Sequence, residues 1–313
     1  MSGGAPTPAI TVIGNVNADL IVRDVSELPP PGEEWEVDAV ELRPGGAAAN
    51  CGLALAALGE APRVVGSVGR DHIGTILLEE LTAAGVATAD VRIEEGQATG
   101  VSIAFEAPGR DRSFLTSLGC LATFDASAVP EDALTARLVL LGGYFLLPAL
   151  RGSGAADLLR RARANGAMTC FDPGWDPTGW PPSTLGELTG ILSSVDVFLP
   201  NGAEAAAIAG AQDPREAARR LQAMLAPAGW TVVKLSAEGC VAAGPDGAET
   251  ASPAPTTAVA DSTGAGDAFN AGLLAAMRAG ADVPDALGLA VRVASAVVGR
   301  PSLDRYPTRA ELG

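Results

Sequence analysis

The chain has 313 residues, 48% hydrophobic and 19% charged, so it can build a large core and is not disordered as a whole. Its 37 acidic and 21 basic residues give a formal net charge of −16, and such a surface repels nucleic acids and anionic membranes. The apolar stretches fall short of the ~20 residues of a membrane span, and the first ten residues do not form a secretory signal. We therefore expect a cytoplasmic protein without nucleic-acid or membrane partners.

Short apolar runs rich in β-branched residues alternate along the chain with helical stretches rich in alanine and leucine. The expected strands are residues 9–13, 63–66, 138–141, 168–172, 195–199 and 231–235. The expected helices are residues 47–58, 73–84, 155–164, 215–225 and 265–279. Three of them are followed by a glycine suited to a left-handed helix end, at Gly59, Gly85 and Gly280. This alternation predicts an α/β fold with a mostly parallel central sheet flanked by helices on both faces.

Two segments depart from the alternation because neither is attached to a helical crossover. Residues 21–42 are rich in proline and acid, and the pattern around Trp35 is that of an edge strand. Residues 99–118 predict a β-hairpin that turns at Pro108-Gly109. We expect both to join in one small antiparallel sheet, a lid over a site. The lid would be formed by insertions at about residues 18–44 and 97–118 of a single domain, residues 1–313.

Several familiar catalytic arrangements find no support in the sequence. The four cysteines lie far apart without a CxxC pair, which argues against a zinc site and a disulfide framework. His72 is the only histidine, and we interpret it as a surface residue at a helix start rather than as part of a catalytic pair. Lys234, the only lysine, lies inside a predicted strand and not in a glycine-rich loop, which excludes a P-loop. No motif gives Lys234 another role.

The sharpest signal is DSTGAGDAFNAGLLAAMRAG, residues 261–280. Small residues at the helix entry leave the backbone amides of Gly264, Ala265 and Gly266 free to point at one spot, where the helix dipole is also positive. Such an anion hole suits the charge of a phosphoryl group in transfer. Asp267 follows in the first helical turn, where a carboxylate is a sensible general base for an attacking hydroxyl. The plainer alternative is a helix N-terminus with a favourable first-turn acid.

These residues resemble the C-terminal signature of the ribokinase-like, or phosphofructokinase-B, carbohydrate and nucleoside kinases. The N-terminal signature of that family, a glycine pair followed by an asparagine, is similar to GGAAAN at residues 45–50. The stretches VGSVGRDHIG (65–74) and PNGAE (200–204) also match in kind and order. The resemblance therefore covers essentially the whole chain. It implies a ribokinase-like fold and an ATP- and Mg²⁺-dependent kinase that phosphorylates a hydroxyl of a sugar or sugar-like polyol.

The resemblance also implies roles for individual residues of this chain. Asp267 would be the general base, with the amides of Gly264, Ala265 and Gly266 around the γ-phosphate. Contacts to the sugar hydroxyls would come from Asp19, Gly45, Gly46 and Asn50. Contacts to the nucleotide would come from Asn201, Ser236, Ala237, Gly239, Asn270, Val291, Ala294 and Ser295. Glu204 would hold Mg²⁺ through water, and the backbone beside Asp261 would bind a monovalent cation such as K⁺.

Each of these assignments has a plainer alternative when it is taken alone. Asp19 fits a turn residue and Asn50 a polar group in a first helical turn, because both residue types concentrate there. The pair Asn201 and Glu204 fits a helix N-cap with its first-turn acid. The family often has lysine where this chain has Ala47, and the stretch 298–302 looks shorter than a potassium loop, so activation by K⁺ stays open.

Three alternative functions also stay open. A nucleoside kinase would stack the base on lid aromatics such as Trp35, Phe105 and Phe114. A phosphosugar kinase would need a cation for the second phosphate, which Arg110 or Arg112 could supply. Outside the class, the scaffold could serve a non-catalytic regulator that binds a sugar or a nucleotide. The exposed edge of the lid sheet further predicts a homodimer formed through the lid.

Overall fold

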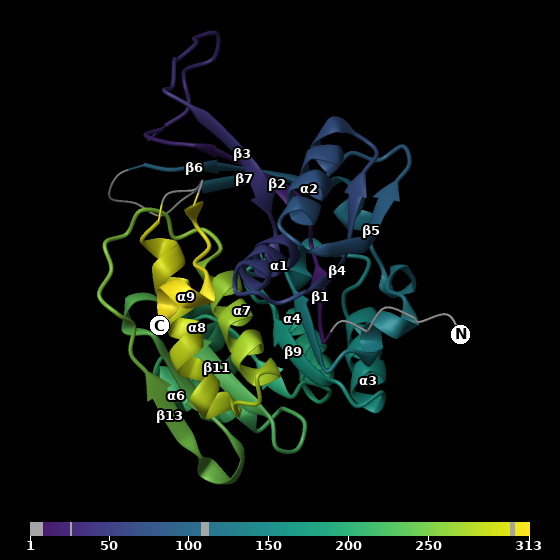
Figure 1. Ribbon diagram of the computed structural model, residues 1–313, viewed down its shortest axis with the longest axis vertical. Coiled ribbons are helices and arrows are strands. Elements are labelled where there is room, and N and C mark those ends of the chain that lie inside the picture. Colours follow the sequence, from purple (N-terminus) through teal and green to yellow (C-terminus); the bar gives the residue numbers. More distant parts are fainter. Residues whose placement is uncertain (1–8, 26, 108–112, 301–303) are drawn as a thin grey trace.

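The computed structural model describes residues 9–25, 27–107, 113–300 and 304–313 (Figure 1). The strands in these ranges form a nine-stranded sheet, in the order β13-β12-β11-β10-β9-β8-β1-β4-β5, and a four-stranded lid sheet, in the order β3-β2-β6-β7. Figure 1 shows the lid sheet beyond one end of the large sheet, next to α1 and α2. The α/β fold with a separate lid is thereby confirmed.

Seven strands of the large sheet run parallel to one another: β1 (Ile10–Gly14), β4 (Arg63–Gly69), β5 (Ala87–Glu94), β8 (Leu138–Gly142), β9 (Met168–Asp172), β10 (Val197–Phe198) and β11 (Trp230–Lys234). Two antiparallel strands complete one edge: β12 (Cys240–Ala243) and β13 (Glu249–Ser252). All six strands expected from the sequence are present, although β10 is shorter than the expected 195–199. The edge strands β5 and β13, and the short strand β12 beside β13, were not predicted because they lack long apolar runs.

Helices cover both faces of the large sheet and bury two separate cores. On one face lie α1 (Ala47–Ala57), α2 (His72–Ala83), α7 (Ala265–Arg278) and α8 (Val283–Val298). On the other lie α3 (Ser153–Ala164), α4 (Pro182–Leu192), α5 (Gly202–Ala209) and α6 (Pro214–Gln222). Val12 packs in the first core and Ile13 in the second, since successive side chains of a strand point to opposite faces. Short 3₁₀ turns occupy residues 119–123, 126–128, 131–135, 144–146, 236–238 and 245–247, and α9 (Arg309–Leu312) follows α8.

The lid sheet contains β2 (Asn17–Val22), β3 (Val40–Gly45), β6 (Val101–Phe105) and β7 (Ser113–Ser117). The antiparallel pairing of β6 with β7 confirms the predicted hairpin, whose turn at Pro108-Gly109 lies outside the described residues. β2 and β3 are also antiparallel, but β2 and β6 are parallel, so the expectation of a wholly antiparallel lid is wrong. The reason is that β2 follows β1 and β6 follows β5, two strands that run in the same direction. Trp35 lies before β3 and not within a strand.

The structure shows the positions of the four cysteines and of His72 and suggests no chemical role for them. The four cysteines are buried and free. His72 is exposed at the start of α2, as expected from the sequence. Among the helices of the described ranges, none is both long and apolar enough to cross a membrane.

Candidate active site

Asp267 lies in the first turn of α7, whose N-cap Gly264 is left-handed with φ 68° and ψ 10°. Its Oδ2 accepts a hydrogen bond of 3.0 Å from Nδ2 of Asn50 in the first turn of α1. Burial, together with the negative charge of Asp172, raises the pKa of Asp267 to about 7. Asp267 is half-buried, and a carboxylate with a near-neutral pKa can accept a proton at physiological pH.

The predicted anion hole is the backbone that leads into α7. Gly266 lies in the first turn, where helix amides have no intrahelical acceptor and point outward along the axis. The amide of Ala265 donates to the carbonyl oxygen of Ser262 at 3.3 Å. A phosphoryl oxygen would share this amide with a long turn hydrogen bond.

The predicted sugar-binding residues meet where the lid sheet joins α1. Asp19 is a buried residue of β2 and not a turn residue, and its carboxylate fills the space that a side chain on Gly45 would need. Gly46, with φ 90°, is the N-cap of α1, and a side chain there would collide with Asn17. Burial raises the pKa of Asp19, although Arg43 and a 3.0 Å hydrogen bond from Asn17 oppose the shift. Because Asn50 contacts Asp267, this group borders the candidate base.

Lys234, which has no role in the sequence-based interpretation, reaches the same centre. It is the last residue of β11, and its Nζ lies 2.6 Å from Oδ2 of Asp172, the last residue of β9. Nζ is also 3.5 Å from the position that a Cβ on Gly266 would take, so the lysine stands beside the anion hole. Ligands of open α/β sheets collect at the carboxyl ends of the strands. A sole lysine at a strand end, in a chain otherwise rich in arginine, is the signal that could have revealed it.

Asn201 and Glu204 form the capping box of α5. The Glu204 amide donates to Asn201 Oδ1 at 2.9 Å, while Asn201 donates to both carboxylate oxygens, at 2.8 Å from its amide and 2.7 Å from Nδ2. This geometry agrees with the plainer interpretation of the pair, a helix N-cap with its first-turn acid. Burial and the charge of Asp172 nevertheless raise the pKa of Glu204 to about 7. Asn201 also forms a β-bridge to Lys234, so Glu204 belongs to the Asp172–Lys234 cluster.

The other positions expected to contact the nucleotide lie in the turn after β11 and on the helices α7 and α8. Ser236, Ala237 and Gly239 form the turn after β11, with φ of 52° at Ser236 and 88° at Gly239. Nδ2 of Asn270 on α7 donates to Asp172 Oδ2 at 2.6 Å, which places Asn270 in the acidic cluster. On α8, Val291 packs in the core, whereas Ala294 and Ser295 are half-buried.

Asp261 is held by protein groups at both carboxylate oxygens. Oδ2 accepts from Nη1 of Arg43 at 2.7 Å, and Oδ1 accepts from the Thr263 amide at 2.8 Å. Burial alone would raise the pKa of Asp261, but the Thr263 amide and Arg43 hold it well below its usual value. Of the stretch compared with a potassium loop, Pro301 and Ser302 lie outside the described residues, as do Arg110 and Arg112.

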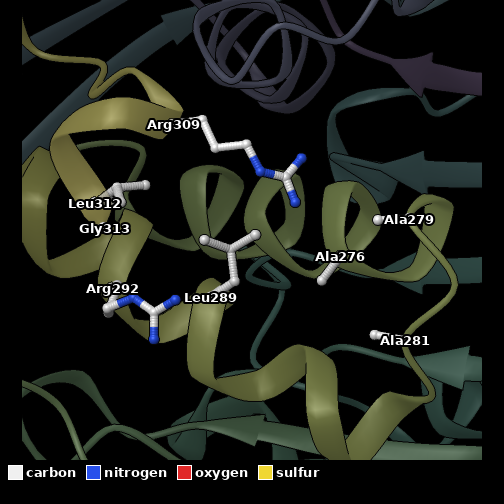
Figure 2. A pocket seen from close by; sticks show the side chains of 8 residues that line it. All are labelled: Ala276, Ala279, Ala281, Leu289, Arg292, Arg309, Leu312 and Gly313. Carbon is white, nitrogen blue, oxygen red and sulfur yellow. The ribbon is translucent and has the colours of Figure 1, made fainter.

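A pocket of about 350 Å³ lies elsewhere, against α7, α8 and α9 (Figure 2). Leu289 stands in its middle, and Arg292 and Arg309 extend along its sides in Figure 2. None of the predicted site residues lines it. We therefore locate the candidate active site by its cluster of charged side chains around Asp172 and Lys234, and not by the volume of a pocket.

The raised pKa of Asp267 predicts how activity depends on pH. For a general base at Asp267 we expect kcat/KM to fall about tenfold per pH unit below pH 7, because only a deprotonated carboxylate can accept a proton. The folded-state pKa lies above the ordinary value of 3.8, so the free energy of unfolding should decrease as the pH rises from 3.8 to about 7. Initial rates and urea unfolding across this range test both. A rate that stays constant down to about pH 5 would contradict the assignment.

Residues 7–309 match the family described as pfkB family carbohydrate kinase. The ATP-dependent ribose-1-phosphate kinase of Halopiger xanaduensis is 29% identical over 94% of this chain and 93% of that protein. The 2-dehydro-3-deoxygluconokinase of Thermoproteus tenax is 28% identical over 86% of this chain and 83% of its own length. The structure of Arabidopsis thaliana ribokinase complexed with ribose and ATP superposes with a TM-score of 0.82 at 22% identity, over 98% of this chain and 97% of that one.

The fold and the family match define the class of protein. The architecture is ribokinase-like, and the chain belongs to the pfkB family of carbohydrate kinases.

Proposed function

We propose that this kinase transfers the γ-phosphoryl group of ATP to a hydroxyl of a sugar or sugar-like polyol, with Asp267 as the general base. The hydrogen bond from Asn50 to Asp267 carries the proposal, because it joins an acceptor-side residue to a half-buried carboxylate at the N-terminus of α7. A non-catalytic regulator would gain nothing from a base of near-neutral pKa. The relatives named above, a ribose-1-phosphate kinase that uses ATP and a sugar-acid kinase, support this reaction type.

The residues divide the reaction between them. Asp19 and Asn50 hold hydroxyls of the acceptor, and the reacting hydroxyl donates a hydrogen bond to Asp267. As its oxygen forms a bond to the γ-phosphorus, Asp267 takes the proton and the bond to the ADP oxygen breaks. The amides of Gly264, Ala265 and Gly266, with Lys234 beside them, stabilise the charge on the phosphoryl oxygens. The lid, formed within the single domain by segments 18–44 and 97–118, excludes water when it closes.

Magnesium fits the charge balance of this cluster. The carboxylates of Asp172, Glu204 and Asp267 face a single lysine, and burial together with repulsion by Asp172 raises the pKa of Glu204 and Asp267. Across the described ranges, three such groups nowhere approach closely enough to hold a metal ion by themselves. Mg²⁺ would therefore be held by nucleotide phosphates and water, with Glu204 behind the water, since Mg²⁺ gives up its water reluctantly. When bound, it neutralises phosphate charge.

The nucleotide itself would extend along the turn after β11. We propose that Ser236, Ala237 and Gly239 contact it, with Ala294 and Ser295 of α8 on the adenine side. A monovalent cation remains part of the proposal only as a ligand of backbone carbonyls beside Asp261, because the carboxylate is already paired with Arg43.

The direct test is ADP release from Mg-ATP across a panel of neutral sugars, polyols, sugar phosphates, sugar acids and nucleosides. Ribose 1-phosphate and 2-dehydro-3-deoxygluconate belong in it because relatives are named for them. We expect release that depends on at least one sugar or sugar derivative. Stimulation by nucleosides alone would overturn the proposed acceptor class, and ATP binding without stimulation by any acceptor would favour the regulator.

We also propose that the kinase forms a homodimer through the lid. The lid carries exposed apolar side chains, with Val40 56%, Phe114 54% and Leu115 58% exposed. Such a surface on an exposed sheet edge favours pairing with a second copy. Sedimentation should give twice the 31.4 kDa mass, and Leu115→Glu should give monomers, whereas Met168→Glu, an equally apolar exposed position off the lid, should not. A monomeric wild type at about 10 µM would contradict the dimer.

A further inference from the structure

Arg305, between the end of α8 and α9, carries a buried charge that no acid of the described residues pairs with in an ion pair. Its exposed fraction is 5%. Neither Nη1 nor Nη2 has a hydrogen-bond acceptor among the residues that the structure describes, and the ion pairs found there do not include Arg305. Buried guanidinium groups are normally paired, because leaving such a charge unpaired is strongly destabilising. The guanidinium group therefore lacks a hydrogen-bond acceptor for both Nη atoms among the described residues.

The guanidinium group is directed at the entry of α7. Its Nη2 lies 3.2 Å from the position that a Cβ on Gly264 would take, and Nδ2 of Asn50 lies 3.1 Å from the same position. Cζ lies 5.4 Å from the centre of the Tyr306 ring. The Tyr306 hydroxyl donates to Oδ1 of Asn50 at 3.1 Å, which fastens this part of the chain to α1.

The two ends of the anion hole face different cations. Lys234 stands beside Gly266, on the side of Glu204, and is paired with Asp172. Arg305 stands beside Gly264, on the side of Asn50. The charge of Arg305 also opposes the rise in the pKa of Asp19 and of Asp267. Arg305 therefore lies within electrostatic reach of the proposed sugar-binding residues.

The other arginine of this side is already engaged. Arg43 forms a 2.7 Å ion pair with Asp261. Arg305, whose two Nη atoms lack an acceptor among the described residues, is therefore the cation on the Asn50 side of the helix entry that is open to a ligand.

We propose that Arg305 binds an anionic substituent of the acceptor, a phosphate or a carboxylate, so that the substrate carries a negative charge in addition to the reacting hydroxyl. The inference rests on the proposed function and narrows its substrate class. A guanidinium offers parallel N–H donors that match two oxygens of either anion. In a chain of net charge −16, such a substrate needs one local cation, and a neutral sugar would leave the charge of this guanidinium uncompensated.

The test compares wild type with Arg305→Gln and Arg305→Lys, and with Arg292→Gln as a control on an exposed arginine outside the site. Each anionic member of the panel is assayed beside its uncharged parent, such as ribose 1-phosphate beside ribose. We expect wild type to prefer an anionic acceptor. Arg305→Gln should raise the KM of that acceptor by about 10- to 100-fold, the effect of losing one or two charge-assisted hydrogen bonds, and leave the KM for ATP unchanged. Arg305→Lys should retain part of the preference.

The outcomes separate the possible anions and the possible failures. Preference for a sugar phosphate or for a sugar acid identifies which anion Arg305 binds. A preference for uncharged acceptors, an equal loss with charged and uncharged acceptors, or a raised KM for ATP would overturn the proposal. If wild type turns over no acceptor, the proposed kinase function fails first. Calorimetric binding of the same anionic compounds without ATP then decides: binding that Arg305→Gln abolishes supports the anion site, and absent or unchanged binding overturns it.

Discussion

Asp267→Asn is expected to lower kcat by about 10²- to 10⁴-fold, the usual contribution of a general base. The amide has nearly the shape of the carboxylate, and its oxygen can still accept the hydrogen bond from Asn50. Folding and the KM for ATP should therefore change little. Because the raised pKa makes the charged form of the wild-type carboxylate unfavourable above pH 7, the variant should also melt at a higher temperature than wild type at pH 8.

The matched control is Asp285→Asn, which alters an exposed first-turn acid of the neighbouring helix α8. It should retain wild-type kcat. Undiminished turnover in Asp267→Asn would remove Asp267 as the base, and equal losses in both variants would indicate a general effect of charge.

Lys234→Met is expected to damage stability and catalysis together. It removes the only lysine of the chain, which pairs with Asp172, and leaves the acids of this cluster with less positive charge nearby. Breaking a buried ion pair from one side costs about 3–5 kcal/mol, which chemical denaturation at pH 8 would measure. Loss of positive charge beside Gly266 should further lower kcat by about 10²-fold or more, as loss of an oxyanion-stabilising group does.

The double variant Lys234→Met/Asp172→Asn separates the two effects. Asparagine at position 172 can still accept from Asn270 and carries no charge, so the double variant should regain part of the lost free energy of unfolding. Its kcat should stay low, because the cation near the phosphoryl group is still absent. Strictly additive losses in stability would show that the Lys234–Asp172 pair contributes nothing specific.

The large sheet could be predicted because its strands are buried on both faces and are separated by helices. The runs that became β1 and β8 are apolar throughout, and alternate residues serve the two cores. The lid was harder, since the pairing of β2 with β6 is set by the direction of β1 and β5, which no local pattern records. The exposed edge strand β5 alternates weakly and gave no signal.

The site divides in the same way. Gly264 to Asp267 are contiguous in the sequence, so the helix start and its acid could be recognised together. The contacts of Lys234 with Asp172, of Tyr306 with Asn50, and the approach of Arg305 to Gly264 join residues far apart in the chain. Lys234 within an apolar strand gives no sign of its partner, because the partner ends another strand. For Glu204 the local pattern was correct but incomplete. The residue forms the capping box of α5 and also belongs to the acidic cluster around Asp172.

The most direct test of the account follows the phosphoryl group itself. In a single turnover with ATP labelled at the γ-phosphorus, wild type and Asp285→Asn should move the label into the acceptor hydroxyl, while Asp267→Asn should leave it on ATP over the same time. Label found in inorganic phosphate in the presence of acceptor, or transferred equally fast by Asp267→Asn, would contradict a kinase that works through this carboxylate.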